Sequence, residues 1–131
     1  MATVPLISDE EASAEVLAVF DDIRATRGTD YINNFWRALA NDPALLASTW
    51  ARLKEVMGPG ELDPLVKEML YIAVSVANGC EYCIHSHTAA ANGKGMTLAQ
   101  HGELLSVIGM AMQTNGLVTA MQVPVDEVFQ A

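Results

Sequence analysis

The sequence of 131 residues has few charged side chains, few aromatic ones and only two cysteines. Charged residues make up 18% of the chain, and seven lysines and arginines stand against sixteen acids, for a net charge of −9. The chain has no basic run that would bind nucleic acid or an anionic membrane surface, so neither is an expected partner. It also lacks the continuous run of about 18 apolar residues that is typical of a membrane span.

Signs of secretion or of several domains are absent as well. The first residues, MATVPLISDEEAS, contain no basic stretch followed by an apolar one, so we expect no signal peptide and a cytoplasmic location. No repeat, low-complexity tract or linker divides the chain, whose length suits a single domain over residues 1–131. In a reducing cytosol, two cysteines close in sequence are more often catalytic or metal-binding than structural.

Apolar side chains are abundant. They make up 51% of the chain and include seven methionines. This is a high share for a soluble monomer, and an excess of apolar surface usually marks an interface between proteins. The composition therefore favours a homo-oligomer.

The pattern of apolar residues predicts an all-α fold of about six helices. Strand signals are weak, because valine and isoleucine do not alternate with polar residues. We expect helices over residues 10–27, 32–40, 43–57, 64–77, 80–92 and 98–122, then about one turn within 125–130. The last long helix should continue through Asn115-Gly116, because its apolar stripe persists across that pair.

Capping residues support these boundaries. Ser8 is the expected N-cap of the first helix, and Glu11, three residues later, completes a capping box. Asp42 and Asp63 each precede a proline, the arrangement that favours a helix start. Thr97, with a glutamine three residues later, repeats the capping-box pattern before the last helix.

Both cysteines lie in the segment NGCEYCIHSHTAAANG, residues 78–93. On a helix, Cys80, Cys83 and His87 fall at positions i, i+3 and i+7, on one face. Cys80 would lie in the first turn, where unpaired N–H groups and the helix dipole stabilise a thiolate. His87, one turn beyond Cys83, is placed to take a proton from that thiol, whereas His85 points elsewhere on the helix.

A carboxylate that orients His87 would complete a proton relay, and Glu68 is the best candidate. Glu68 lies ten residues before Asn78, and His87 lies eight residues after Gly79. If the flanking helices form an antiparallel hairpin, the rise of ~1.5 Å per residue brings both side chains to about the same height. The alternative is that Glu68 is exposed to water and favoured only by the helix dipole.

Three kinds of chemistry are compatible with the cysteine pair. A redox dithiol would use two thiols one turn apart that form a disulfide by local adjustment. A zinc site would take the cysteines and His87, with His85 or His101 as a fourth ligand. Three ligands on one helical turn crowd a tetrahedron, however, and no second CxxC or HxxxH completes the set. A structural pair would simply bury two small side chains. Haem attachment is excluded, because no histidine directly follows the second cysteine.

The segment KEMLYIAVSVANGCEYCIHSHTAAA, residues 67–91, resembles the core motif of the alkylhydroperoxidase D-like (AhpD-like) proteins of the carboxymuconolactone decarboxylase superfamily. That motif is a glutamate, eleven intervening residues and CxxCxxxH, and Glu68, Cys80, Cys83 and His87 match it. The similarity extends to EEASAEVLAVFDDIRATRG, to NFWRALANDPALLASTWARLKEVMGPGELDPLVKEML and to TNGLVTAMQVPVDEVF. It therefore covers nearly the whole chain.

The resemblance implies a compact all-α fold that assembles as trimers, hexamers or related homo-oligomers. It also implies thiol-dependent reduction of hydroperoxides, in which Cys83 is the peroxidatic thiolate and Cys80 resolves its sulfenic acid as a disulfide. His87 and Glu68 would form the proton relay. We expect no bound cofactor or metal, and an external dithiol or lipoyl protein would restore the thiols. The helix dipole favours Cys80 as the more acidic thiol, but the relay favours Cys83, which we take as the attacking residue.

Tyr82 is the main departure from that family. Its well-studied peroxidase members have a histidine directly before the second cysteine, where this sequence has Tyr82. A tyrosine donates a hydrogen bond but is a poor base near neutral pH, which counts against efficient turnover of alkyl hydroperoxides. The alternatives are a general protein disulfide reductase, a redox sensor, or a non-catalytic zinc or structural module. Lactone decarboxylation is not expected, because the decarboxylases of the superfamily lack the cysteine pair.

Overall fold

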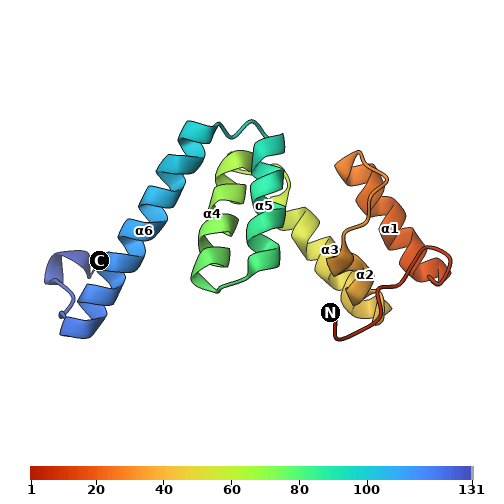
Figure 1. The fold of residues 1–131 in the computed structure, drawn as a ribbon, viewed down its shortest axis with the longest axis horizontal. Helices are drawn as coiled ribbons and strands as arrows, with labels where there is room; N and C mark the ends of the chain where they lie inside the picture. Colours follow the sequence, from red (N-terminus) through yellow and green to blue (C-terminus); the bar gives the residue numbers. More distant parts are fainter. Residues whose placement is uncertain (131) are drawn as a thin grey trace. The chain divides into compact units, whose positions relative to one another are not determined.

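A computed structural model of the chain describes residues 1–130, which form six α-helices, one short 3-10 helix and no strand. The all-α prediction is confirmed. The chain forms two compact units, one from Met1 to Gly58 and the other beginning at Pro59 (Figure 1). Each unit has its own buried core, and each is described by itself. The single domain expected over residues 1–131 stays a prediction.

The first unit contains helices α1 (Ala14–Arg27), α2 (Asn34–Leu39) and α3 (Pro43–Met57). Helices α1 and α2 both pack against α3. Trp36 of α2 meets Trp50 of α3 edge to face, with ring centroids 5.4 Å apart. The remaining buried residues of this core are apolar: Val16, Phe20, Ile23, Ile32, Ala40 and Leu46.

Helix α1 begins later than the sequence predicts. Ser8 and Glu11 do exchange the two hydrogen bonds of a capping box, from Ser8 N–H to Glu11 Oε2 at 2.9 Å and from Glu11 N–H to Ser8 Oγ at 3.3 Å. That box closes only a turn, however, and the N-cap of α1 is Ser13, whose hydroxyl accepts the Val16 N–H. The prediction of a helix from residue 10 was wrong, because a second capping residue lies nearer to the apolar stripe.

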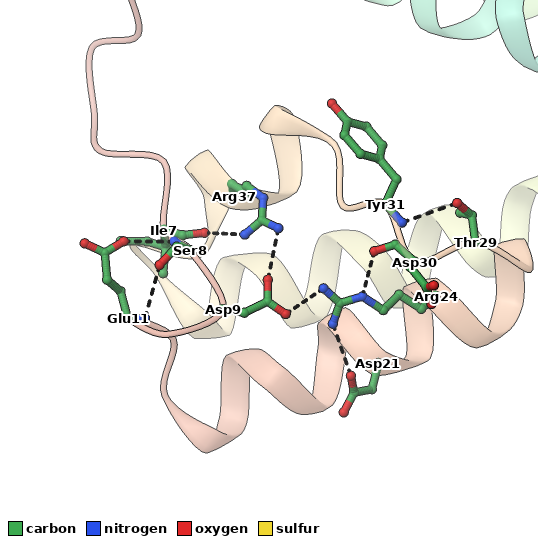
Figure 2. Close-up of polar contacts among 10 residues, drawn as sticks. All are labelled: Ile7, Ser8, Asp9, Glu11, Asp21, Arg24, Thr29, Asp30, Tyr31 and Arg37. Carbon is green, nitrogen blue, oxygen red and sulfur yellow. Dashed lines mark hydrogen bonds and ion pairs between the residues drawn. The ribbon is translucent and has the colours of Figure 1, made fainter.

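The turn ahead of α1 is held by an ion-pair network around Asp9 (Figure 2). Its carboxylate contacts Arg24 of α1 at 2.6 Å and Arg37 of α2 at 3.0 Å. Arg37 also donates to the Ile7 carbonyl oxygen, and Arg24 donates to that of Asp30. The hydrogen bond from Arg24 is the main cause that lowers the pKa of Asp9. The network fastens the N-terminal segment to two helices.

The second unit contains helices α4 (Pro64–Ala77), α5 (Glu81–Gly93) and α6 (Leu98–Met121), followed by the short helix η1 (Glu127–Phe129). Helices α4 and α5 lie side by side as an antiparallel hairpin (Figure 1), and α6 contacts α4. The buried core consists of Ile72, Ala91, Met96 and Ile108. The predicted bounds of α4 are confirmed, as are a continuous α6 across Asn115-Gly116 and a final single turn.

Helix α6 exposes much of its apolar surface. Ile108 is its one buried residue, whereas most of the other large apolar side chains along the helix are at least half exposed. Within residues 1–130, α6 is also the one helix long and apolar enough to cross a membrane, judged by length and composition alone. A helix of this composition equally suits the interface of an assembly.

Candidate active site

The site begins at the tight turn between α4 and α5. Asn78 caps the end of α4, and Gly79 has a φ of 66°, in the left-handed region that a glycine enters without steric cost. The Cys80 N–H donates to the Ser75 carbonyl oxygen at 2.9 Å, which fixes the entry into α5. Cys80 is the N-cap of α5, one position before the first turn that the sequence predicts. The difference arises because its sulfur acts as the capping acceptor for the Cys83 N–H, at 3.3 Å.

Cys80 and Cys83 are joined by a disulfide, with their Cα atoms 5.3 Å apart. A disulfide between these two cysteines is therefore compatible with an intact start of α5. Both cysteines are partly buried. Tyr82, between them, is 45% exposed. One end of the α4–α5 hairpin thus carries a sulfur pair next to water.

Glu68 and His87 meet across the hairpin. The distance from Glu68 Oε2 to His87 Nδ1 is 2.7 Å. This contact confirms the expected antiparallel arrangement, in which residues on either side of the turn reach the same height. Glu68 is only 4% exposed, so the alternative of a solvated carboxylate is wrong. His87 lies one helical turn after Cys83, on the same face of α5.

Lys94 occupies the other oxygen of this carboxylate. Its ammonium lies 2.8 Å from Glu68 Oε1 and is held there by the C-cap of α5, where the Lys94 N–H donates to the Ala90 and Ala91 carbonyl oxygens. Burial raises the pKa of Glu68, but the hydrogen bonds and charges of His87 and Lys94 outweigh burial and lower the pKa below its usual value. Glu68 is therefore an ionised carboxylate that is buried away from water.

Tyr71 stacks on the His87 ring. The two ring centroids lie 3.6 Å apart, with an angle of 19° between the planes. Because Tyr71 follows Glu68 by three residues on α4, both side chains reach His87 from the same helix face. The imidazole is thus held at its edge by the carboxylate and at its face by the phenol ring.

Sequence reasoning missed Lys94 and Tyr71, although both left a signal. Lys94 is the single lysine or arginine after residue 67, in a stretch that contains a buried acid. Tyr71 has the i+3 spacing from Glu68 that places it on the same face. Neither signal was decisive, because a lysine in NGKG is equally typical of a solvated helix end.

The other histidines lie apart from this arrangement. His85 is exposed on α5, and His101 belongs to α6. Over residues 1–130, no group of three or more His, Cys, Asp or Glu side chains has the geometry to hold a metal ion. The zinc hypothesis therefore finds no ligand set in the described part of the chain.

The chain belongs to the carboxymuconolactone decarboxylase family, whose model matches residues 43–126. It is similar to the crystal structure of an alkylhydroperoxidase AhpD core from Rhodospirillum rubrum, with 66% sequence identity and a TM-score of 0.97. That match covers 100% of this chain and 98% of the other. The chain is also 29% identical over 82 residues to an uncharacterised protein of Cupriavidus necator, a match that covers 63% of this chain and 73% of that protein. The fold is therefore AhpD-like.

Proposed function

We propose that the protein is a thiol-dependent peroxidase that reduces hydroperoxides through the Cys80–Cys83 pair. The observation that carries the proposal is the placement of this disulfide and of the Glu68–His87 contact on a single helical hairpin. The AhpD-like fold and the similarity to an alkylhydroperoxidase core support the same class of reaction.

The first step would be an attack by the Cys83 thiolate on the outer oxygen of the hydroperoxide. A sulfur–oxygen bond forms, the O–O bond breaks, and the alkoxide leaving group takes a proton to become an alcohol. His87 would supply that proton from Nε2, since its Nδ1 is engaged by Glu68. Glu68 would stabilise the imidazolium from which the proton leaves.

The second step would close the disulfide. The Cys80 thiolate attacks the sulfur of the Cys83 sulfenic acid, the S–O bond breaks, and the departing hydroxide is protonated to water. An external dithiol then reduces the disulfide by exchange and leaves as its own disulfide. One hydroperoxide and one dithiol are thus converted into an alcohol, water and an oxidised donor. A dithiol or lipoyl protein is the expected donor, and no bound cofactor is required.

Steady-state peroxide consumption with several hydroperoxides and several dithiol donors tests the proposal. Both single variants, Cys83→Ser and Cys80→Ser, should lose turnover, and Cys83→Ser should also fail to consume one equivalent of peroxide in a single turnover. His87→Gln and Glu68→Gln should lower kcat/KM by about 10²-fold or more, the usual contribution of general acid–base catalysis. His85→Gln, an exposed histidine of the same helix, is the matched control and should keep the parent rate.

Normal peroxide reduction by Cys83→Ser would contradict the proposal.

Thiol–disulfide exchange with protein substrates is a second candidate, favoured by the exposed ring of Tyr82 beside the disulfide, where peroxidase relatives carry a histidine. Rapid reduction of a protein disulfide together with slow consumption of every hydroperoxide would support that candidate. We expect the protein to act in the cytoplasm, without nucleic acid or membrane partners.

A further inference from the structure

The Lys94 contact stands out because of where the lysine lies. No other lysine or arginine follows residue 67, yet the side chain of this one reaches the buried Glu68 on the neighbouring helix. Its own side chain is 39% exposed, against 5% for that of Glu68. The ammonium therefore lies at the boundary between water and the site, with one hydrogen bond directed inward.

A buried carboxylate needs compensation on both oxygens. Ionised carboxylates are costly in a dry environment unless charge and hydrogen bonds replace the lost water. His87 serves Oε2 and Lys94 serves Oε1, so the carboxylate can neither turn nor take up a proton without losing a contact. Without Lys94, the imidazole alone would have to offset the charge of Glu68.

We propose that Lys94 is a positioning residue of the relay: its ammonium holds Glu68 ionised, with Oε2 turned toward His87, so that Nδ1 of the imidazole keeps its proton and Nε2 is left to exchange one. The role rests on the proposed function, because it concerns the same proton path. Lys94 acts through Glu68 and contacts neither sulfur in the described hydrogen bonds and ion pairs.

Two charged or titratable neighbours, His87 and Lys94, act on this carboxylate. The groups that shift the pKa of Glu68, apart from burial, are His87 on α5 and Lys94 at its C-cap. The other titratable side chains on the packed helices are Lys67 and Tyr71 on α4, Glu81, Tyr82 and His85 on α5, and His101 and Glu103 on α6. Removal of Lys94 should therefore act on Glu68 more strongly than removal of a distant cation.

The test compares Lys94→Met, Lys94→Gln and Lys94→Arg with Arg52→Met. Arg52 is a matched control, because its one ion pair, to Glu55, is largely exposed and belongs to α3. The first readout is the pKa of Glu68 from the ¹³C carboxyl shift of the oxidised protein, which requires no turnover. We expect this pKa to rise by about one unit or more in Lys94→Met and Lys94→Gln, as for loss of a close opposite charge. Lys94→Arg should restore it, and Arg52→Met should leave it unchanged.

A second readout is the ¹⁵N signal pattern of His87, which reports the ring nitrogen that carries the proton. Lys94→Met should lose the single Nδ1–H form, whereas Lys94→Arg should keep it. A third readout is the acid limb of kcat/KM, which should move to higher pH in Lys94→Met, with about a tenfold loss at one pH unit below the parent midpoint.

An unchanged Glu68 titration and an unchanged His87 pattern in both neutral variants would overturn the proposal, whatever the activity. If Lys94→Met does not fold, Lys94→Gln provides the same comparison, because its amide can donate to Oε1 but carries no charge. If the parent protein reduces no peroxide while the two spectroscopic changes occur, the proposed function fails and the role of Lys94 in holding Glu68 stands. The two outcomes are therefore distinguishable.

Discussion

The carboxylate of Glu68 has a different partner on each of its two oxygens. The His87 imidazole lies at Oε2, and the Lys94 ammonium lies at Oε1. In the proposed mechanism the two contacts differ in kind: the imidazole exchanges a proton, and the ammonium holds the acid in place. The pH dependence of the protein should therefore reflect the protonation of one residue, Glu68.

The stability of the protein should report on Glu68 as the pH falls. The pKa of Glu68 is lowered in the folded chain from the ordinary value of 4.5, so the unfolded chain binds the proton more readily. The stabilisation is therefore fully present above about pH 4.5 and is lost as the pH falls through the folded pKa. Urea unfolding of the parent and of Glu68→Gln between pH 7 and pH 3 measures it. The difference between the two free energies of unfolding should be constant above pH 6 and should move toward destabilisation of the parent below 4.5. A difference independent of pH would contradict this assignment.

The aromatic ring of Tyr71, and not its hydroxyl group, should contribute to the rate of peroxide reduction. Tyr71→Phe keeps the ring that lies on His87, so we expect kcat to stay within about twofold of the parent. Tyr71→Ala removes it and frees the imidazole, with an expected fall in kcat of about tenfold or more. Steady-state peroxide reduction measures both. Equal losses in the two variants would point to the hydroxyl instead.

The sequence alone predicted part of this site. Glu68 and His87 were paired correctly because helix rise fixes their height on either side of the Asn78-Gly79 turn. Lys94 was missed, because its contact with Glu68 depends on a flexible side chain that folds back from the end of α5 onto the preceding helix, α4. No periodicity encodes that contact. The position of Cys80 was wrong by one residue, since an N-cap and a first-turn residue differ only in backbone conformation.

At the scale of the elements, the helix starts carry measurable stability. Thr97 and Gln100 exchange both hydrogen bonds of a capping box at the start of α6. Thr97→Ala removes one of them, and we expect a loss of about 1 kcal/mol in the free energy of unfolding. Thr114→Ala is the control, because that hydroxyl bonds only to carbonyl groups of its own helix. Chemical unfolding followed by far-ultraviolet circular dichroism measures both, and equal effects would show that the cap is not responsible.

The elements whose bounds were predicted best begin with an acid followed by a proline. Asp42 and Asp63 each cap a helix whose first residue is that proline, and both helices start where the sequence places them. Two fixed backbone angles and a capping side chain leave little choice there. Ser8 and Ser13, by contrast, are both good caps five residues apart. The ion pairs of Asp9 with two arginines hold the first as a turn, and these long-range contacts have no signature in the local sequence.

For the whole molecule, the exposed surface of α6 argues for association with other copies. Leu105 and Met112, one heptad apart, are 49% and 53% exposed, although water is a poor environment for both. We propose a homo-oligomer in which this surface is covered, with a trimer or hexamer as the expected size. Composition suggested such an assembly but could not say which helix provides the interface, because every amphipathic helix buries some apolar surface.

A charge placed on that surface should break the assembly. Leu105→Glu and Met112→Glu each set an acid within the apolar surface of α6, so the apparent mass should fall toward that of a single chain. Gln113→Glu adds the same charge at an exposed polar position and should leave the mass unchanged. Light scattering after size-exclusion chromatography measures all three. A parent protein that runs as a monomer would contradict the proposal outright.

The α4–α5 hairpin also bears on how the site can evolve. The sulfur pair, the carboxylate, the imidazole, the stacked ring and the ammonium all come from one unbroken stretch between Glu68 and Lys94. The left-handed glycine that turns the chain back lies inside it. A short duplication or recombination event would therefore transfer all of the proposed site residues at once. The rest of the chain would then remain free to drift toward new substrates and new subunit contacts.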